Sequence, residues 1–187
     1  MDEIVALLKQ DAVGVLPTDT LYGIVGRAAT PRAVSRIYDI KGRDEHKPFI
    51  ILISSPSDLK KFNITLTSTQ KKILNKVWPG PVSVILPCPH KSFEYLHRGT
   101  RSLAFRLPKN PFLQTLIKKT GPLVAPSANP QSKKPAETIL QAQKYFADQV
   151  DFYISGGTKK GKASTIIDLT TDTPQIIRKG SKPLRLE

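Results

Sequence analysis

The sequence has little of what disulfide-rich, thiolate-metal and membrane-spanning proteins require. Its 187 residues include one cysteine, Cys88, which excludes an internal disulfide framework and a metal site built from several thiolates. Apolar runs such as residues 49–53 are far too short to cross a bilayer. The first residues, Met1-Asp2-Glu3, are acidic where a signal peptide is basic. We therefore expect a cytoplasmic protein with no membrane partner.

Acidic residues are scarce in the middle of the chain. The sequence has 29 Lys+Arg and 15 Asp+Glu, a net charge of +14. Between residues 59 and 136 the only acid is Glu94, and the bases are Lys60, Lys61, Lys71, Lys72, Lys76, Lys91, Arg98, Arg101, Arg106, Lys109, Lys118, Lys119, Lys133 and Lys134. Any one of these bases fits an ordinary solvated surface, but together they indicate a surface that binds anions.

The apolar patterns predict a single α/β domain over residues 1–187. Helices are expected at 2–10, 31–40, 57–61, 67–77, 111–119 and 135–146, and strands at 12–16, 49–53, 82–86, 102–107, 123–125, 152–154, 165–169 and 174–178. Because strands and helices alternate without a strict repeat, the sheet is expected to be mixed, partly antiparallel, and covered by helices.

A glycine-lysine segment at residues 156–162 imitates a phosphate-binding loop without being one. Its sequence, GGTKKGK, fits most of the G-x-x-x-x-G-K-[ST] pattern, but Ala163 replaces the final hydroxyl. The next residues, TIID, favour a strand, whereas a phosphate loop leads into a helix. We reject the phosphate-loop interpretation and expect a flexible basic loop, able to close over a polyanion.

Two short motifs carry polar groups at element ends. PTDTLYG (17–23) leaves a strand and could hold a small polar ligand, or it could be a turn in which Asp19 bonds local amides. KGR (41–43) ends a helix, so its cations could offset the helix dipole or hold a polyphosphate.

The predicted strand at 102–107 separates its side chains by alternation. Leu103, Phe105 and Leu107 point one way, and Ser102, Ala104 and Arg106 the other. Arg106 then needs water or an anionic partner, such as a ligand carboxylate. In the loop after the predicted strand 123–125, two prolines flank Ser127 and Asn129 and would hold these side chains toward a ligand. We find no pattern for a serine nucleophile or a glycosidase carboxylate pair.

Eight ordered blocks together resemble one family, the YrdC/Sua5 family of threonylcarbamoyl-AMP synthases. They are PTDTLYG (17–23), KGR (41–43), KPFIILI (47–53), WPGPVSVIL (78–86), SLAFRLP (102–108), APSAN (125–129), GKASTIID (161–168) and IIRKG (176–180). The resemblance covers about residues 12–180. It implies a twisted mixed sheet with a basic concave cavity, and the chain is similar to the short, single-domain type.

The resemblance also implies an activity. The family joins L-threonine, bicarbonate and ATP into threonylcarbamoyl-AMP and pyrophosphate, for the N6-threonylcarbamoyl modification of tRNA adenosine 37. Mg²⁺ would be held mainly by ATP phosphates and water. The expected partners are these substrates, the transferase machinery that uses the product, and tRNA or double-stranded RNA.

Site residues follow from the same resemblance, block by block. Lys41 and Arg43 would be catalytic and hold the triphosphate. Further ATP contacts would come from Lys47, Ser102, Ser127, Asn129 and Arg178. Threonine would be bound by Thr20, Arg106, Ala125 and Ser164. Leu52 stands where some relatives have a histidine beside threonine.

The sequence leaves two alternatives open. A non-catalytic RNA-binding module would fit the net charge, although the chain has no RRM or KH signature and no interleaved aromatics. A carbamoyl-transfer domain like those of hydrogenase maturation proteins shares the expected fold, but occurs in larger chains with acylphosphatase and zinc-finger parts.

Overall fold

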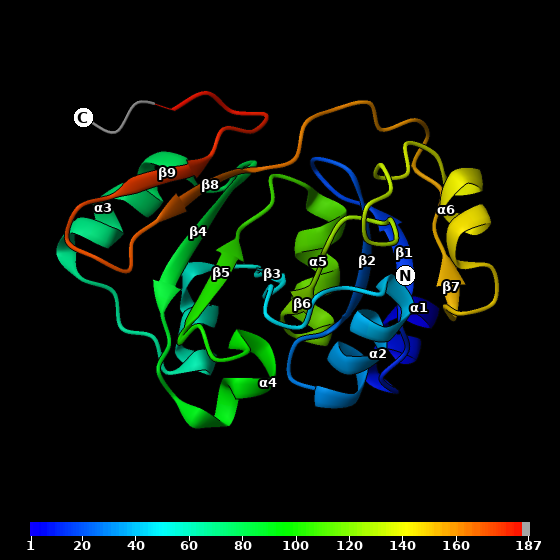
Figure 1. Cartoon of the computed structure of the whole chain (residues 1–187), viewed down its shortest axis with the longest axis horizontal. Helices are drawn as coiled ribbons and strands as arrows, with labels where there is room; N and C mark the ends of the chain where they lie inside the picture. The colour runs from blue at the N-terminus through cyan, green and yellow to red at the C-terminus, as the bar shows by residue number, and fades with distance from the viewer. Residues whose placement is uncertain (185–187) are drawn as a thin grey trace.

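A nine-stranded mixed sheet forms the centre of the computed structural model, which describes residues 1–184 (Figure 1). The strands are β1 (Gly14–Pro17), β2 (Tyr22–Arg27), β3 (Ile50–Leu52), β4 (Val82–Pro87), β5 (Ser102–Arg106), β6 (Leu123–Val124), β7 (Phe152–Tyr153), β8 (Thr165–Asp168) and β9 (Gln175–Arg178). Their order is β7-β1-β2-β6-β3-β5-β4-β8-β9. The pairs β1/β7, β3/β5 and β4/β8 are parallel and the other pairs antiparallel, which confirms the predicted mixed sheet.

Helices cover the sheet and the connections between its strands. They are α1 (Asp2–Lys9), α2 (Pro31–Lys41), α3 (Ser68–Val77), α4 (Glu94–His97), α5 (Pro111–Thr120) and α6 (Ile139–Phe146), with 3₁₀ turns η1 (Pro56–Phe62) and η2 (Lys91–Phe93). Across residues 1–184, no helix combines the length and apolar character that crossing a membrane takes.

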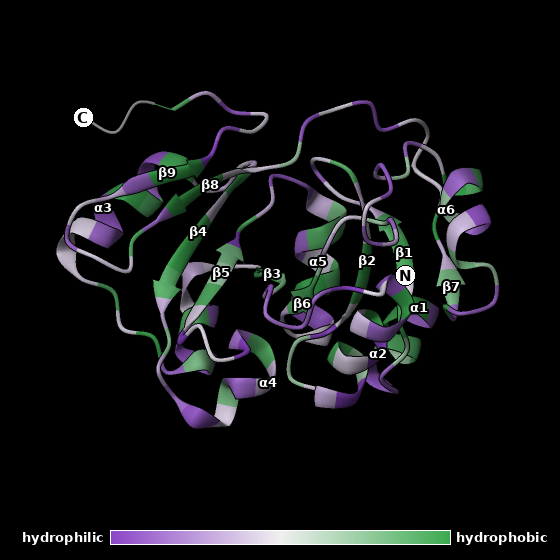
Figure 2. Cartoon of the chain, in the orientation of Figure 1, coloured by the Kyte–Doolittle hydropathy of each residue, from purple (hydrophilic) through white to green (hydrophobic). Residues whose placement is uncertain are grey.

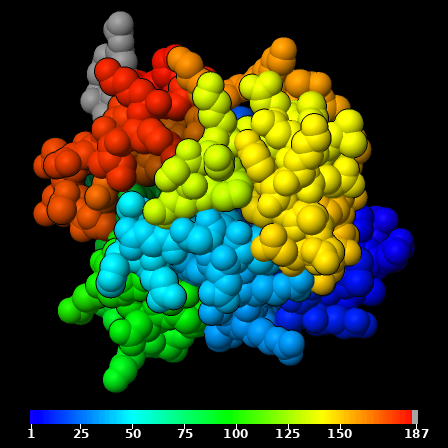
Figure 3. All heavy atoms as spheres, turned by 45° about the vertical axis from the view of Figure 1, so that its right-hand side comes forward, coloured from blue at the N-terminus to red at the C-terminus, as the bar shows by residue number. Residues whose placement is uncertain are grey.

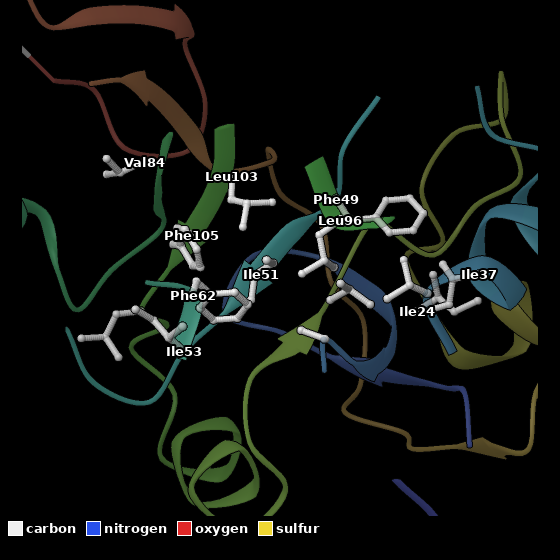
Figure 4. Close-up of a cluster of buried hydrophobic side chains, with 14 of the residues drawn as sticks. Ile24, Ile37, Phe49, Ile51, Ile53, Phe62, Val84, Leu96, Leu103 and Phe105 are labelled. Atoms are coloured by element: carbon white, nitrogen blue, oxygen red, sulfur yellow. The ribbon is translucent and has the colours of Figure 1, made fainter. Parts of the chain in front are cut away.

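Two apolar clusters lie on opposite faces of the sheet, as strand alternation requires. Val15 belongs to the larger cluster and its neighbour Leu16 to the smaller one, where α1 and α5 pack. In the larger cluster the rings of Phe62 and Phe105 meet edge to face, with centroids 5.1 Å apart (Figure 4). Apolar residues follow the strands, while loops and outer helix faces are polar (Figure 2). This packing holds the strand ends that carry the site.

Strand β2 was not predicted: the sequence pattern indicated only a polar turn before it and assigned no element to residues 24–27. Gly23 and Gly26 interrupt the apolar run and weaken the strand pattern. Gly26 is needed because α2 packs closely: a Cβ there would lie 3.2 Å from Ile37 and 3.3 Å from Ala33. The short helix α4 was also missed. The strand is the larger error, because β2 pairs with both β1 and β6.

Helix boundaries differ from prediction where local capping decides them. The helix expected at 135–146 begins only at Ile139, because the Thr138 hydroxyl accepts the Gln141 amide as an N-cap. The helix expected at 57–61 is the 3₁₀ turn η1. Helix α2 ends at Lys41, one residue beyond the predicted end, and its C-cap is Gly42, which has φ 54° in the left-handed region.

The connection from β7 to β8 crosses the whole sheet, over the top of the molecule in Figure 1. Seven strand spacings separate the two strands, about 34 Å along a flat sheet. Residues 154–164 reach about 40 Å when fully extended, so they have little slack. The Tyr22 hydroxyl fastens this segment by donating to the Gly157 carbonyl (2.7 Å) and accepting from the Gly156 amide (2.9 Å). Because β8 follows it directly, rejecting the phosphate-loop interpretation was correct.

Gly180 is expected to tolerate no side chain. A Cβ there would overlap the backbone of Ala163, Ser164 and Thr165, so Gly180→Ala forces the start of β8 to move. We expect a loss of about 1–3 kcal/mol in the free energy of unfolding, a fall in Tm of roughly 2–10 °C for a chain of this size. Gly161→Ala is the matched control, since its Cβ would meet only the Thr20 carbonyl, at 3.4 Å. Equal Tm values for the two variants would contradict this packing.

Candidate functional site: an arginine-lined cavity

A cavity of about 290 Å³ opens between the β1–β2 turn, β5, the loop after β6 and the start of β8. Eight of the predicted site residues line it: Thr20, Arg43, Ser102, Arg106, Ala125, Ser127, Ser164 and Arg178. The side chains of Lys41, Lys47 and Asn129 are not part of the lining. Figure 3 shows the segments near residues 45, 130 and 180 adjoining on one face of the molecule.

The alternation predicted for residues 102–107 is confirmed. Ser102, Ala104 and Arg106 line the cavity, while Leu103 and Phe105 are fully buried in the larger apolar cluster. The strand itself ends at Arg106. Strand β5 therefore forms one wall of the cavity with its polar face.

Arg106 is buried and forms an ion pair with Asp19 across the cavity wall. Its Nη2 lies 3.0 Å from Asp19 Oδ1, and the two side chains are 4% and 6% exposed. This contact is an ion pair and not a well-aligned hydrogen bond, and within residues 1–184 no other group hydrogen-bonds to either Asp19 oxygen or to Arg106 Nε. Burial lowers the pKa of Arg106, and the Asp19 carboxylate opposes that shift. The guanidinium thus keeps donors to spare beside the cavity.

Thr18, and not Asp19, closes the β1–β2 turn. The Thr18 hydroxyl donates to the Leu21 carbonyl (2.6 Å) and accepts the amides of Thr20 and Leu21 (3.2 Å each). It also accepts Arg106 Nη2 at 3.4 Å. The alternative in which Asp19 bonds local amides is therefore wrong. With the turn closed by Thr18, Asp19 is free to face Arg106.

Three arginines, Arg43, Arg106 and Arg178, share the cavity. Burial lowers the pKa of Arg178, and the positive charges of Arg106 and Arg43 lower it further. Burial likewise lowers the pKa of Arg43, whose guanidinium lies 5.4 Å from the Phe49 ring centroid. Positive charges this close repel one another. A bound anion would relieve that repulsion, so the three guanidiniums favour anion binding in the cavity.

The side chains of Lys41 and Arg43, on either side of Gly42, point in different directions. Arg43 enters the cavity, while Lys41 is 2% exposed and donates from Nζ to the carbonyls of Ser127 (2.6 Å) and Asn129. Burial lowers the pKa of Lys41 to about 7, and the charge of Arg43 adds to the effect. Lys41 therefore supports the loop that carries Ser127.

The remaining predicted ATP contacts lie at different depths. Ser127 lines the cavity and donates from Oγ to Asn129 Oδ1 (2.6 Å), and Asn129 Nδ2 donates to the carbonyls of Pro130 (2.9 Å) and Lys133 (2.7 Å). The Lys47 ammonium is exposed and pairs with Asp44 at 3.3 Å. The backbone carbonyl of Lys47 accepts Arg43 Nε at 3.0 Å, so this residue positions Arg43 through its main chain.

Ser164 and Arg178 form one unit. Arg178 donates from Nε to the Ser164 carbonyl (3.0 Å) and from Nη2 to its Oγ (3.1 Å), and Ser164 Oγ lies 2.8 Å from Ser83 Oγ. Sequence reasoning missed Ser83, a buried hydroxyl within an apolar strand. The contact of the Tyr22 hydroxyl with the crossing segment was not predicted either. The polar residue inside the run VSVIL was the available signal for Ser83.

Neither Leu52 nor a cluster of metal-ligating side chains is part of the cavity lining within residues 1–184. Leu52 is fully buried in the smaller cluster beside Arg106 in the β3–β5 register, and does not line the cavity. Residues 1–184 contain no group of three or more His, Cys, Asp or Glu side chains placed to hold a metal. The donors of the described residues therefore do not form a protein-held metal site of this kind.

The fold is a mixed α/β domain with an arginine-lined cavity, and comparisons with known proteins identify its family. The Sua5/YciO/YrdC family model, described as "Telomere recombination", matches residues 6–180. The chain is 34% identical over 179 residues to the threonylcarbamoyl-AMP synthase of Bacillus subtilis, covering 94% of this chain and 51% of that protein. The protein belongs to the Sua5/YciO/YrdC family.

Solved structures agree with this assignment. Pyrococcus abyssi Sua5 complexed with L-threonine matches with a TM-score of 0.89 at 29% identity, over 95% of this chain and 53% of that one. E. coli YciO matches with a TM-score of 0.85 at 26% identity, over 96% and 88%. The chain spans about half the length of the curated B. subtilis and P. abyssi relatives, 51% and 53%.

Lys41→Met should remove a pH dependence from stability. Since the Lys41 pKa falls to about 7 on folding, the unfolded chain binds more protons between pH 7 and the ordinary lysine pKa. Over that range Lys41 makes wild-type stability rise by ~1 kcal/mol per pH unit. Urea unfolding at pH 7, 8 and 9 measures it. The exposed control Lys72→Met should keep the wild-type slope; a wild-type slope in Lys41→Met would show that Lys41 is not desolvated.

Proposed function

We propose that the protein is a nucleotidyltransferase that forms threonylcarbamoyl-AMP from L-threonine, bicarbonate and ATP, with release of pyrophosphate and water. The observation that carries the proposal is the cavity, where one buried arginine faces a space shared with two further arginines. Such a cavity matches a substrate set with one carboxylate and one polyphosphate. Relatives bearing the synthase name, and a related Sua5 complexed with L-threonine, support it.

The threonine end is assigned to the β1–β2 turn and its surroundings. Arg106 would pair with the threonine carboxylate through its spare donors. Thr20, Ser164 and the Ala125 backbone would surround the rest of the amino acid. Thr20 Oγ1 lies 3.2 Å from Thr18 Oγ1. Either hydroxyl could be the donor in that contact.

The nucleotide end is assigned to Arg43 and Arg178, with Ser102 and Ser127 beside them. Arginine suits this task because its planar fork fits phosphate oxygens. Lys41, Lys47 and Asn129 remain predicted ATP contacts, and each would have to turn toward the substrate. Without that turn, Lys41 and Asn129 act by holding the loop of Ser127.

The chemistry requires positioning and positive charge more than a side-chain nucleophile. The threonine amine and bicarbonate combine, with loss of water, to an N-carboxylate whose oxygen attacks the α-phosphorus. Pyrophosphate leaves in line with the attack. The arginines hold both anions together and offset the charge that develops on the phosphates. Mg²⁺ is assigned to the nucleotide substrate, carried by its phosphates and water.

The product would serve the N6-threonylcarbamoyl modification of tRNA adenosine 37, through a downstream transferase in the cytoplasm. Direct contact with tRNA or double-stranded RNA is part of the same proposal, supported by exposed lysines such as Lys133 and Lys134 beside the cavity loop. A non-catalytic RNA binder would not need three arginines gathered around one cavity of this size.

Purified protein should release pyrophosphate and form the adenylate only when ATP, L-threonine and bicarbonate are all present. Omission of any one should reduce pyrophosphate to background, because attack on phosphorus needs the assembled N-carboxylate. Coupled phosphate detection and mass spectrometry of the product measure both outcomes. Product formation that is indifferent to threonine would refute the activity, and tight, salt-sensitive RNA binding without adenylate would favour the binding module.

Arg106→Ala should weaken threonine use about 10- to 100-fold, measured as KM, with a much smaller effect on ATP binding. The reason is the loss of a charge-assisted pair with the carboxylate. Arg32→Ala, an exposed arginine on α2, is the control and should behave like wild type. The Tm of each variant is recorded, because Arg106→Ala leaves Asp19 unpaired. Equal losses for threonine and ATP in a folded variant would contradict the role given to Arg106.

A further inference from the structure

Asp19 is a buried carboxylate whose hydrogen-bonding capacity is unused. Both its oxygens are inaccessible to solvent, and neither has a hydrogen-bond partner within residues 1–184. Leaving such a group unsatisfied is costly. Among the described residues, its close charged contact is Arg106 Nη2, at 3.0 Å. The position of this carboxylate therefore calls for an explanation beyond the closure of the turn, which Thr18 already provides.

The electrostatics of the cavity give that explanation. Arg43, Arg106 and Arg178 line the cavity, and its lining within residues 1–184 includes no Asp or Glu. Three uncompensated guanidiniums would hold any small anion, including bicarbonate, phosphate or a simple carboxylic acid. Asp19 cancels the charge of Arg106 in particular. An anion that binds Arg106 must therefore approach a carboxylate of its own sign.

A zwitterionic ligand has a favourable interaction with both members of the pair. Its carboxylate pairs with Arg106, and its positively charged ammonium group is attracted by the negative charge of Asp19. At a few ångströms and partial burial, such an interaction is large enough to change an affinity about tenfold. The Arg106–Asp19 pair is thus complementary to an α-amino acid and unfavourable to a plain carboxylate.

We infer that Asp19 is the specificity residue that makes the Arg106 subsite select a zwitterionic amino acid over simple carboxylate anions. It does so through the charge it places beside Arg106, without contact with the ligand. This inference rests on the proposed function, because it takes the threonine end of the cavity to be at Arg106. It adds why the subsite does not fill with the bicarbonate or phosphate that accompany the reaction.

The test compares two ligands that differ only at the amine: L-threonine and 2,3-dihydroxybutyrate of matching configuration. Calorimetry gives Kd values for wild type, Asp19→Asn and the exposed control Asp148→Asn. Wild type and Asp148→Asn should prefer threonine. Asp19→Asn should bind threonine about tenfold more weakly and dihydroxybutyrate severalfold more tightly. A purely structural role for Asp19 would move both affinities in the same direction, and that result would overturn the inference.

Two wild-type measurements keep the outcomes separate, even if Asp19→Asn does not fold. Wild type that binds threonine and dihydroxybutyrate equally would overturn the zwitterion selectivity and leave the proposed function standing. Wild type that binds other L-amino acids more tightly than their hydroxy-acid counterparts, yet not threonine, would overturn the proposed function and support the selectivity. Asp19→Glu, which retains the charge, should keep the preference for the amine-bearing ligand.

Discussion

The buried ion pair between Arg106 and Asp19 is the contact around which the cavity is built. It joins the end of β5 to the β1–β2 turn, although β6 and β3 stand between β2 and β5 in the sheet. Three strand spacings amount to about 14 Å on a flat sheet, so the turn must lean over the polar face of β5. The same lean closes one side of the cavity. Breaking the pair would leave a buried charge without compensation, which is far costlier than losing a surface ion pair.

Backbone geometry, as well as side-chain type, decides which polar and charged side chains reach the cavity. At Gly42 the left-handed conformation turns the chain so that Lys41 supports the Ser127 loop while Arg43 enters the cavity. The nearly extended segment 154–164 crosses from one side of the sheet to the other and delivers Ser164, just before β8, to the cavity lining. Each device depends on conformations that side-chain chemistry alone does not specify.

Much of the fold and most of the cavity lining could be predicted because they follow local rules. Period-two alternation placed Arg106 and Ser102 on one face, and strand ends supplied the loops. Strand β2 could not be predicted, since its glycines serve the close approach of α2, a tertiary requirement. The partner of Asp19 lies 87 positions along the chain, so no local pattern could reveal it. No local pattern could show that Arg43 lines the cavity while Lys41 contacts the distant Ser127 carbonyl, for the same reason.

The division of labour between lysine and arginine follows from their different desolvation. The net charge of +14 is carried largely by exposed lysines, which remain hydrated and cost little. The cavity instead uses arginines, whose delocalised charge survives burial. Lys41 demonstrates the difference: burial lowers its pKa to about 7, so a lysine in the place of Arg106 could lose the charge that a carboxylate needs. Keeping three positive charges around one cavity at neutral pH therefore favours guanidinium groups, and one carboxylate beside them sets which anion they accept.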